Sequence, residues 1–272
     1  MPITADYHLH SSFSGDSTAP MEEMIRSAVS KGFKSLCFTE HMDIDFPISE
    51  QTPEGTFTVQ TDSYLYELAK LKEAYSDQIK ILFGIELGVQ PHLKRELARY
   101  AKSYEFDFII ASTHVVQKQD PYYPPFFENR TDEEAYRIYF EEVLTCLKSF
   151  SNFDVFGHID YVVRYGTYRD RDYSYDKYAD LFEKIIDRLL DMEKGIEINT
   201  GGLRKGLREA NPCNAFLKRY REKGGEIITV GSDAHNPADL GADFARAAQI
   251  LTDCGFKYYT TFDQRVPAFH KL

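Results

Sequence analysis

The sequence predicts an α/β fold in which repeated βα units surround a parallel sheet. Short β-rich runs alternate with longer helical patterns along the whole chain, which is typical of such units. A length of 272 residues suits an α/β barrel that forms a single unit. No linker, break in composition or internal repeat divides the chain. We therefore expect one domain over residues 1–272.

Seven β-rich runs are the expected strands, and helical patterns follow them in turn. The strands cover residues 3–10, 35–41, 80–86, 106–114, 154–158, 195–200 and 226–235. The helices cover residues 20–31, 62–77, 91–103, 132–149, 175–193, 211–223 and 237–252. In the second helix Asp62 is a candidate N-cap, and leucines recur at helical spacing, so one face is expected to pack on the sheet. Long connections at 42–61, 115–131 and 165–174 are expected to be lids or binding loops.

Composition and charge narrow the class of protein. The apolar fraction of 43% and charged fraction of 28% are those of a globular protein, and no stretch approaches the roughly 20 apolar residues of a membrane span. A net charge of −11 disfavours nucleic acid and anionic membranes as partners. The four cysteines are scattered and no signal-peptide pattern is present, so we expect a cytoplasmic protein with reduced thiols. Nothing in the sequence distinguishes a monomer from an oligomer.

Residue types that ligate metals fall at the ends of the expected strands. His8 and His10 stand at i and i+2 of an extended run, so their side chains point to the same face. In parallel α/β folds the carboxyl ends of the strands converge on one rim, so such residues are expected to meet there. The strand-end residues are His8, His10, His41, Glu86, His114, His158, Asp233 and His235, and Asp16 joins them from the first loop. His92 and His270 fall outside this set and are expected on the surface.

Nine candidate ligands are too many for one ion that takes four to six. Two or three ions that share ligands fit the count better, and Glu86 is the natural bridge because it is the only carboxylate at the end of a central strand. Histidine and carboxylate ligands without thiolates suit divalent Zn, Fe or Mn.

Most of the candidate ligands belong to six short motifs: HLH (8–10), TEH (39–41), GIE (84–86), STH (112–114), GHID (157–160) and GSDAH (231–235). These motifs resemble those of the polymerase and histidinol phosphatase (PHP) superfamily. Their order and spacing match from residue 3 to about residue 245. The resemblance implies a distorted, TIM-like (β/α)7 barrel with three divalent ions at its C-terminal face.

The resemblance also implies how the ligands are shared among the ions. One ion would take His8, His10, Glu86 and Asp233; a second would take Glu86, His114 and His158; a third would take Asp16, His41 and His235. All nine positions of the family pattern are filled in this chain.

Four further features narrow the resemblance: the length of the chain, the opening DYHLHSSFSGDS (6–17), the stretch EINTGGLRKG (197–206) and the long aromatic loops. In these features the chain resembles the stand-alone histidinol-phosphate phosphatases of the superfamily. This resemblance implies hydrolysis of L-histidinol phosphate to L-histidinol and phosphate in histidine biosynthesis. A hydroxide that bridges two ions would attack phosphorus directly, so no phosphoenzyme is required.

Other polar residues near the expected rim are candidates for substrate contacts. Arg164 and Arg204 are placed to grip the phosphate, and Arg164 is the stronger candidate. Asp16 is a candidate ligand and also a candidate general acid, and Ser14 and Asn199 are candidates for hydrogen bonds to the substrate. An aromatic wall and nearby carboxylates would suit the imidazole and amine; the candidates are Phe46, Tyr122, Tyr123, Phe126 and Phe127 with Asp43, Asp45, Asp120 or Asp160.

Three other functions stay open on the sequence alone. The first is a phosphoesterase that acts on another small phosphate monoester. The second is a metal-dependent deacetylase of the amidohydrolase type, against which the two arginines count. The third is a binding or scaffold module without turnover.

Overall fold

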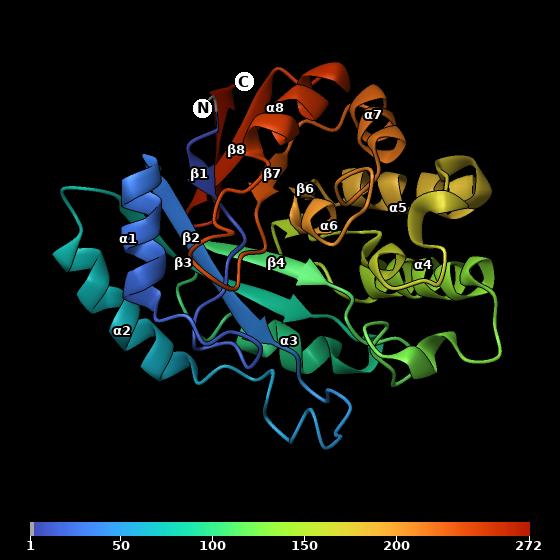
Figure 1. The fold of residues 1–272 in the computed structure, drawn as a ribbon, viewed down its shortest axis with the longest axis horizontal. Helices are drawn as coiled ribbons and strands as arrows, with labels where there is room; N and C mark the ends of the chain where they lie inside the picture. The colour runs from blue at the N-terminus through green and yellow to red at the C-terminus, as the bar shows by residue number, and fades with distance from the viewer. Residues whose placement is uncertain (1–2) are drawn as a thin grey trace.

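In the computed structural model, which describes residues 3–272, seven parallel strands form one sheet in which neighbours follow chain order. The predicted α/β barrel is confirmed, and Figure 1 shows the helices arranged around the strands. The strands are β1 (Ala5–Asp6), β2 (Ser35–Met42), β3 (Lys80–Gly88), β4 (Phe108–Ser112), β5 (Val155–Phe156), β6 (Gly195–Asn199) and β7 (Ile228–Gly231).

Hydrogen bonds between the segments that contain β1 and β7 bring the two ends of the sheet together. The amide of Tyr7 donates to the carbonyl of Val230 at 3.1 Å, and the amide of Asp233 donates to the carbonyl of His8 at 2.7 Å. Beyond Asp6 the chain leaves the regular ladder, so the strand expected over residues 3–10 is much shorter in the structure. These contacts nearly close the sheet into a TIM-like (β/α)7 barrel.

Eight α-helices and five short 3₁₀ turns lie in the described chain. The helices are α1 (Met21–Lys31), α2 (Thr61–Ala74), α3 (Lys94–Tyr100), α4 (Asp132–Ser149), α5 (Ala179–Asp191), α6 (Gly201–Arg204), α7 (Asn214–Glu222) and α8 (Phe244–Asp253). The 3₁₀ turns are η1 (Pro91–Leu93), η2 (Pro124–Phe127), η3 (Tyr161–Arg164), η4 (Arg169–Arg171) and η5 (Tyr175–Tyr178). In residues 3–272, no helix combines the length and the apolar character needed to cross a membrane.

Helix boundaries follow local signals where such signals exist. Helix α4 begins as expected because Thr131 and Glu134 form a capping box. Helix α2 lacks the expected Asp62 cap, since it begins one residue earlier, at Thr61. The helix expected over 237–252 begins only at Phe244, because the chain first forms turns in which Gly241 has a φ of +65°.

The sequence analysis missed a C-terminal hairpin of β8 (Tyr258–Asp263) and β9 (Val266–Lys271). Phe262 packs on Phe108 with ring centroids 5.0 Å apart, and its carbonyl accepts a hydrogen bond from the Tyr7 hydroxyl at 2.7 Å. Arg265 donates to Asp154, which immediately precedes β5. The hairpin therefore packs at the amino ends of the strands.

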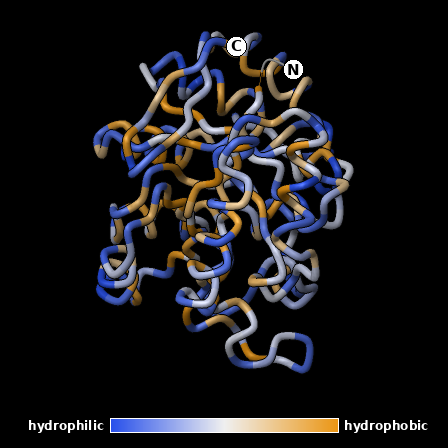
Figure 2. Tube along the Cα trace, turned by 90° about the vertical axis from the view of Figure 1, so that its left-hand side faces the viewer, coloured by the Kyte–Doolittle hydropathy of each residue, from blue (hydrophilic) through white to orange (hydrophobic). Residues whose placement is uncertain are grey.

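The core is one hydrophobic cluster that includes side chains from every strand except the exposed β9. Figure 2 shows the hydrophobic segments mainly inside the molecule and the hydrophilic ones toward its outside. Strands β3 and β4 are buried along almost their whole length, as expected of parallel strands that helices cover. The polar side chains buried at the carboxyl ends of these strands are therefore exceptions that need partners.

Candidate metal centre and active site

The nine candidate ligands meet at the carboxyl rim of the barrel. Six of the seven barrel strands supply residues there, either within the strand or a few positions after its end, and Asp16 reaches the rim from the loop after β1. His8 Nε2 lies 3.2 Å from Glu86 Oε2, and His235 Nε2 lies 3.0 Å from Asp16 Oδ2. Residues that are more than 200 positions apart in the chain thus become neighbours.

Glu86 lies at the centre of the cluster and is fully buried. Its Oε2 is 3.2 Å from His8 Nε2 and 3.1 Å from His41 Nδ1. Its Oε1 is 3.2 Å from His114 Nε2 and 3.0 Å from His158 Nε2. Burial would raise the pKa of this carboxyl, but His8 and His114 hold it well below its usual value. An ionised carboxylate with different histidines at its two oxygens is suited to bridge two cations.

Four sets of three side chains place potential ligand atoms within 4.8 Å of one another. The sets are His8, His10 and Asp233; His8, Glu86 and His158; His41, Glu86 and His114; and His10, His41 and His235. The first set agrees with the sharing that the family resemblance implies. The other sets divide the same side chains differently, and Asp16 belongs to none of the four although it contacts His235.

Several atoms of the cluster are buried without a hydrogen-bond partner in the described chain. They are His8 Nε2, His10 Nε2, His41 Nδ1, His158 Nδ1 and Glu86 Oε2. Leaving such atoms unpaired costs about 1–3 kcal/mol each. Burial and the neighbouring His41 also lower the pKa of His10 well below its usual value, so its imidazole is the neutral form that binds metals. The donor set therefore fits divalent ions.

The far sides of the histidine rings are held by residues that sequence reasoning missed or placed elsewhere. His8 Nδ1 lies 2.7 Å from Glu197 Oε1, and His114 Nδ1 lies 2.8 Å from Asp43 Oδ1. Such contacts fix the tautomer and leave Nε2 free as a ligand. Glu197 had a detectable signal, because β6 is the one strand of the seven-stranded sheet without a candidate ligand at its end and carries a buried carboxylate instead.

Ser14 does not lie in the cavity wall where a substrate contact was expected. Its side chain is buried, and its hydroxyl donates to Glu40 Oε2 at 2.5 Å and lies 3.0 Å from His10 Nδ1. Asn199 is also fully buried. Its amide oxygen accepts a hydrogen bond from Arg164, and its amide nitrogen donates one to Glu197. Both residues support the site from behind, and neither is free to contact substrate.

The two candidate arginines both line the cavity but differ in what they contact. Arg164 is buried, and each of its three nitrogens donates to a protein side chain, with Nη1 2.9 Å from Asp233 Oδ2. Arg204 donates from Nη2 to the carbonyl of Ser232 at 2.6 Å, while its Nη1 is buried without a partner in the described chain. Arg204 thus has one nitrogen without a partner in the described chain, whereas two N–H groups remain on Arg164 beyond its three contacts.

A cavity of about 770 Å³ opens over the cluster, a size typical of small-molecule sites. Phe46, Tyr122 and Tyr123 line it as expected, but Phe126 is fully buried elsewhere and Phe127 does not reach it. The aromatic lining that the sequence analysis did not name is Phe57, Tyr161 and Tyr165.

The four acidic loop residues have separate environments. Asp120 lines the cavity, and burial raises its pKa to about 7. Asp43 lines the cavity as well but is bound to His114. Asp160 is buried outside the cavity lining, and Asp45 is exposed and pairs with His92. His92 and His270 are exposed, as predicted.

The parallel barrel and its rim of histidines and carboxylates define a class, the α/β barrels with a cluster of potential metal ligands at the ends of their strands. The PHP domain family matches residues 6–201, and the chain belongs to this family.

Relatives from two bacteria match nearly the whole chain. A probable histidinol-phosphatase of Clostridium acetobutylicum is 32% identical over 93% of this chain and 94% of its own length. The histidinol-phosphatase of Lactococcus lactis is 32% identical over 94% of this chain and 93% of its own. A crystal structure of the Lactococcus lactis histidinol phosphate phosphatase complexed with zinc, L-histidinol and phosphate superimposes with a TM-score of 0.87 at 31% identity. That match covers 97% of this chain and 98% of the other.

Proposed function

We propose that this protein is a histidinol-phosphatase, which hydrolyses L-histidinol phosphate to L-histidinol and inorganic phosphate as a step of histidine biosynthesis. The observation that carries the proposal is the full-length likeness to the Lactococcus lactis enzyme, whose crystal structure contains zinc, L-histidinol and phosphate. The cluster of potential metal ligands beneath a cavity of suitable size supports it.

Three divalent ions are proposed for the cluster, with Glu86 shared between two of them. His8, His10, Glu86 and Asp233 would hold one ion; Glu86, His114 and His158 a second; Asp16, His41 and His235 a third. Bound ions would neutralise the phosphoryl oxygens and lower the pKa of a coordinated water so that it can attack phosphorus.

The arginines and Asp16 are proposed to act on the phosphate and on the leaving oxygen. Arg204 would donate from its unpartnered Nη1, and Arg164 from the N–H groups left beyond its three contacts. Burial opposes ionisation of Asp16, yet His41 and His235 hold its pKa well below the usual value. Asp16 therefore rests as a carboxylate, which suits a ligand, and would need a proton from water before it could serve as the general acid.

The aromatic wall and Asp120 are proposed to select the histidinol part of the substrate. Phe46, Tyr122 and Tyr123 offer ring surface to an imidazole. An ammonium group placed near Asp120 would favour its ionised form, although burial raises its pKa to about 7. The attraction between the ammonium group and the Asp120 carboxylate would favour binding of an amino alcohol phosphate over a sugar phosphate that carries no positive charge.

A turnover panel tests the proposal. Phosphate release is measured from histidinol phosphate, a nucleoside monophosphate, a sugar phosphate and p-nitrophenyl phosphate, with an N-acetylated amino acid as the probe for deacetylation. Histidinol phosphate is expected to give the highest kcat/KM by at least tenfold, and chelation should abolish its turnover. A higher kcat/KM for another phosphate monoester would refute histidinol phosphate as the preferred substrate but would still identify the protein as a phosphatase.

A further inference from the structure

Three side chains, two of them buried asparagines, hold the guanidinium of Arg164. Asn211 Oδ1 accepts from Arg164 Nε at 2.8 Å, and Asn199 Oδ1 accepts from its Nη2 at 2.8 Å. With Asp233 on Nη1, all three nitrogens of the planar guanidinium are engaged. Three acceptors in one plane fix both the position and the rotation of the group.

Asn211 can adopt only one amide orientation. Its oxygen must face Arg164, which only donates, and its nitrogen donates to Asp160 Oδ1 at 2.5 Å. Backbone hydrogen bonds in both directions between Asn211 and Asn199 tie it to the end of β6. The amide is thus held by both its backbone and its side chain.

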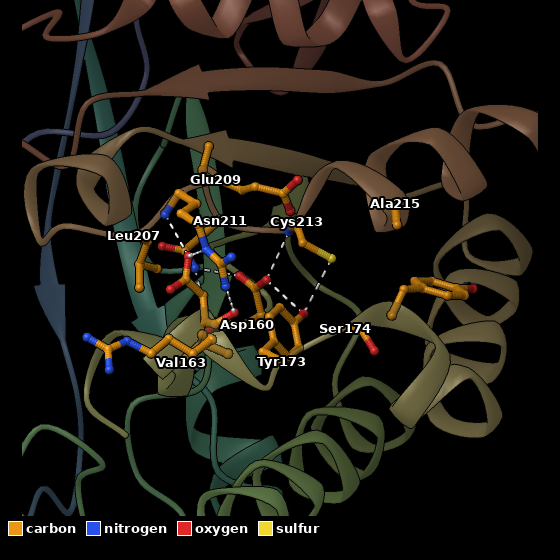
Figure 3. A pocket seen from close by; sticks show the side chains of 14 residues that line it. Asp160, Val163, Tyr173, Ser174, Leu207, Glu209, Asn211, Cys213 and Ala215 are labelled. Carbon is orange, nitrogen blue, oxygen red and sulfur yellow. Dashed lines mark hydrogen bonds and ion pairs between the residues drawn. The ribbon is translucent and has the colours of Figure 1, made fainter. Parts of the chain in front are cut away.

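Asp160 anchors this amide to two further segments. Its Oδ2 accepts from the amide of Cys213 at 2.9 Å and from the hydroxyl of Tyr173 at 2.9 Å. Figure 3 shows Asp160, Asn211, Tyr173 and Cys213 joined in this way. Because every contact to Asp160 comes from a donor, its carboxylate sets the direction of the whole chain of hydrogen bonds from Tyr173 to Asp233.

The paired glycines of the EINTGGLRKG stretch provide the space for this network. A Cβ on Gly202 would overlap Asn211 Oδ1, and a Cβ on Gly201 would lie 2.9 Å from Asn199 Oδ1. Neither glycine has a positive φ. Close packing against the two amide oxygens, and not backbone conformation, is what restricts these positions.

We infer that Asp160 and Asn211 are positioning residues: they hold the guanidinium of Arg164 so that one nitrogen fixes Asp233 and the remaining N–H groups stay aimed at a phosphate in the cavity. The amides that support Arg164 are neutral, so Asp233 is the one carboxylate that it contacts in the described chain. This inference rests on the phosphate-binding part of the proposed function.

Exchanging the two positioning residues tests the inference. Asn211→Asp alone puts a second carboxylate beside Asp160, and Asp160→Asn alone leaves one buried donor without an acceptor. The double variant, Asn211→Asp with Asp160→Asn, restores a donor and an acceptor between the two side chains and keeps acceptors for Arg164, Cys213 and Tyr173; only the longer contact from residue 211 to the carbonyl of residue 160 is lost. Asp154→Asn is the matched control, because Asp154 is also buried and hydrogen-bonded to an arginine but lies at the opposite end of the barrel.

The readouts are the Kd for inorganic phosphate by calorimetry on metal-loaded protein, kcat/KM, bound metal and Tm. Each single variant is expected to weaken phosphate binding and kcat/KM about 10- to 100-fold, and the double variant to recover at least part of both. Asp154→Asn should lower Tm without either loss. If a single variant does not fold, Gly202→Ala takes its place. The added methyl group would push the Asn211 amide away from Arg164, so this variant is expected to weaken phosphate binding to a similar extent.

Single variants that bind phosphate as tightly as Asp154→Asn would overturn the inference, and so would a double variant as weak as the worse single one. Because phosphate binding needs no substrate, it separates this inference from the proposed function. Wild-type protein that binds phosphate but does not hydrolyse histidinol phosphate would refute only the proposed substrate.

Discussion

Glu86→Gln is the perturbation that most directly tests the metal centre. The substitution keeps the size of the side chain but replaces one oxygen with a donor nitrogen and removes the charge. In the structure Oε1 and Oε2 face different sets of histidines, so both proposed ions on Glu86 lose an anionic ligand. Loss of a residue that only supports a metal ligand weakens metal affinity about 10- to 100-fold, so loss of a direct anionic ligand is expected to weaken the binding of each of the two ions by at least that factor.

The assay is elemental analysis of protein purified without chelator, together with phosphate release. We expect Glu86→Gln to retain at least one metal equivalent fewer than wild type, with nearly complete loss of turnover. Glu86→Ala should lose more than one equivalent. His92→Ala and His270→Ala are the controls, because both histidines are exposed and lie outside the cluster. A full metal content in both Glu86 variants would refute the bridging role, and loss of one equivalent in both would restrict Glu86 to a single ion.

Four further outcomes are expected. Arg164→Ala should lower kcat/KM about 30- to 1,000-fold. Arg164→Lys should restore only part of this loss, because an ammonium group cannot donate to all three acceptors that the guanidinium contacts. Equal kcat/KM of the wild type and both variants would contradict this role. Glu197→Gln should remove the charged contact to His8 and so weaken the binding of the ion proposed for His8 about 10- to 100-fold, measured by competition with a chromophoric chelator. Where the free metal concentration is 1,000 times Kd, adding a chelator should remove about 4 kcal/mol from the free energy of unfolding and lower the calorimetric Tm by roughly 10 °C. An unchanged Tm would argue against metal sites of that affinity. Hydrogen bonds from Arg219 and then Lys223 lower the pKa of Glu183 to about 2. The stability that these contacts provide is therefore present above pH 4.5 and lost as the pH falls toward 2. Over that range the difference in urea midpoint between wild type and Glu183→Gln should shrink.

The sequence identified much of the barrel and of its rim because both depend on local patterns. All seven predicted strands are present in the sheet, and the residues at their ends converge because parallel strands share one direction. The hairpin of β8 and β9 was missed because neither strand lies in the barrel sheet, and β9 is exposed along its whole length, so no hydrophobic alternation marks it.

Partners of polar side chains could not be predicted in the same way. Ser14 and Asn199 were expected to contact substrate, but their partners Glu40 and Arg164 occupy them instead. Arg164 was expected to grip the phosphate, and the structure shows that each of its three nitrogens already donates to a protein side chain. Residue type and position say that such a side chain needs partners, and only the packed structure says which.

The sequence by itself thus determined the class of fold, the family motifs and the set of side chains at the rim, since these follow from periodicity and from where strands end. The tertiary structure alone decided the supporting contacts, such as Glu197 on His8, 189 positions away, and Arg164 on Asp233, 69 positions away. The physical reason is that a hydrogen bond depends on distances of about 3 Å between atoms, and chain folding sets those distances between residues that no local pattern connects.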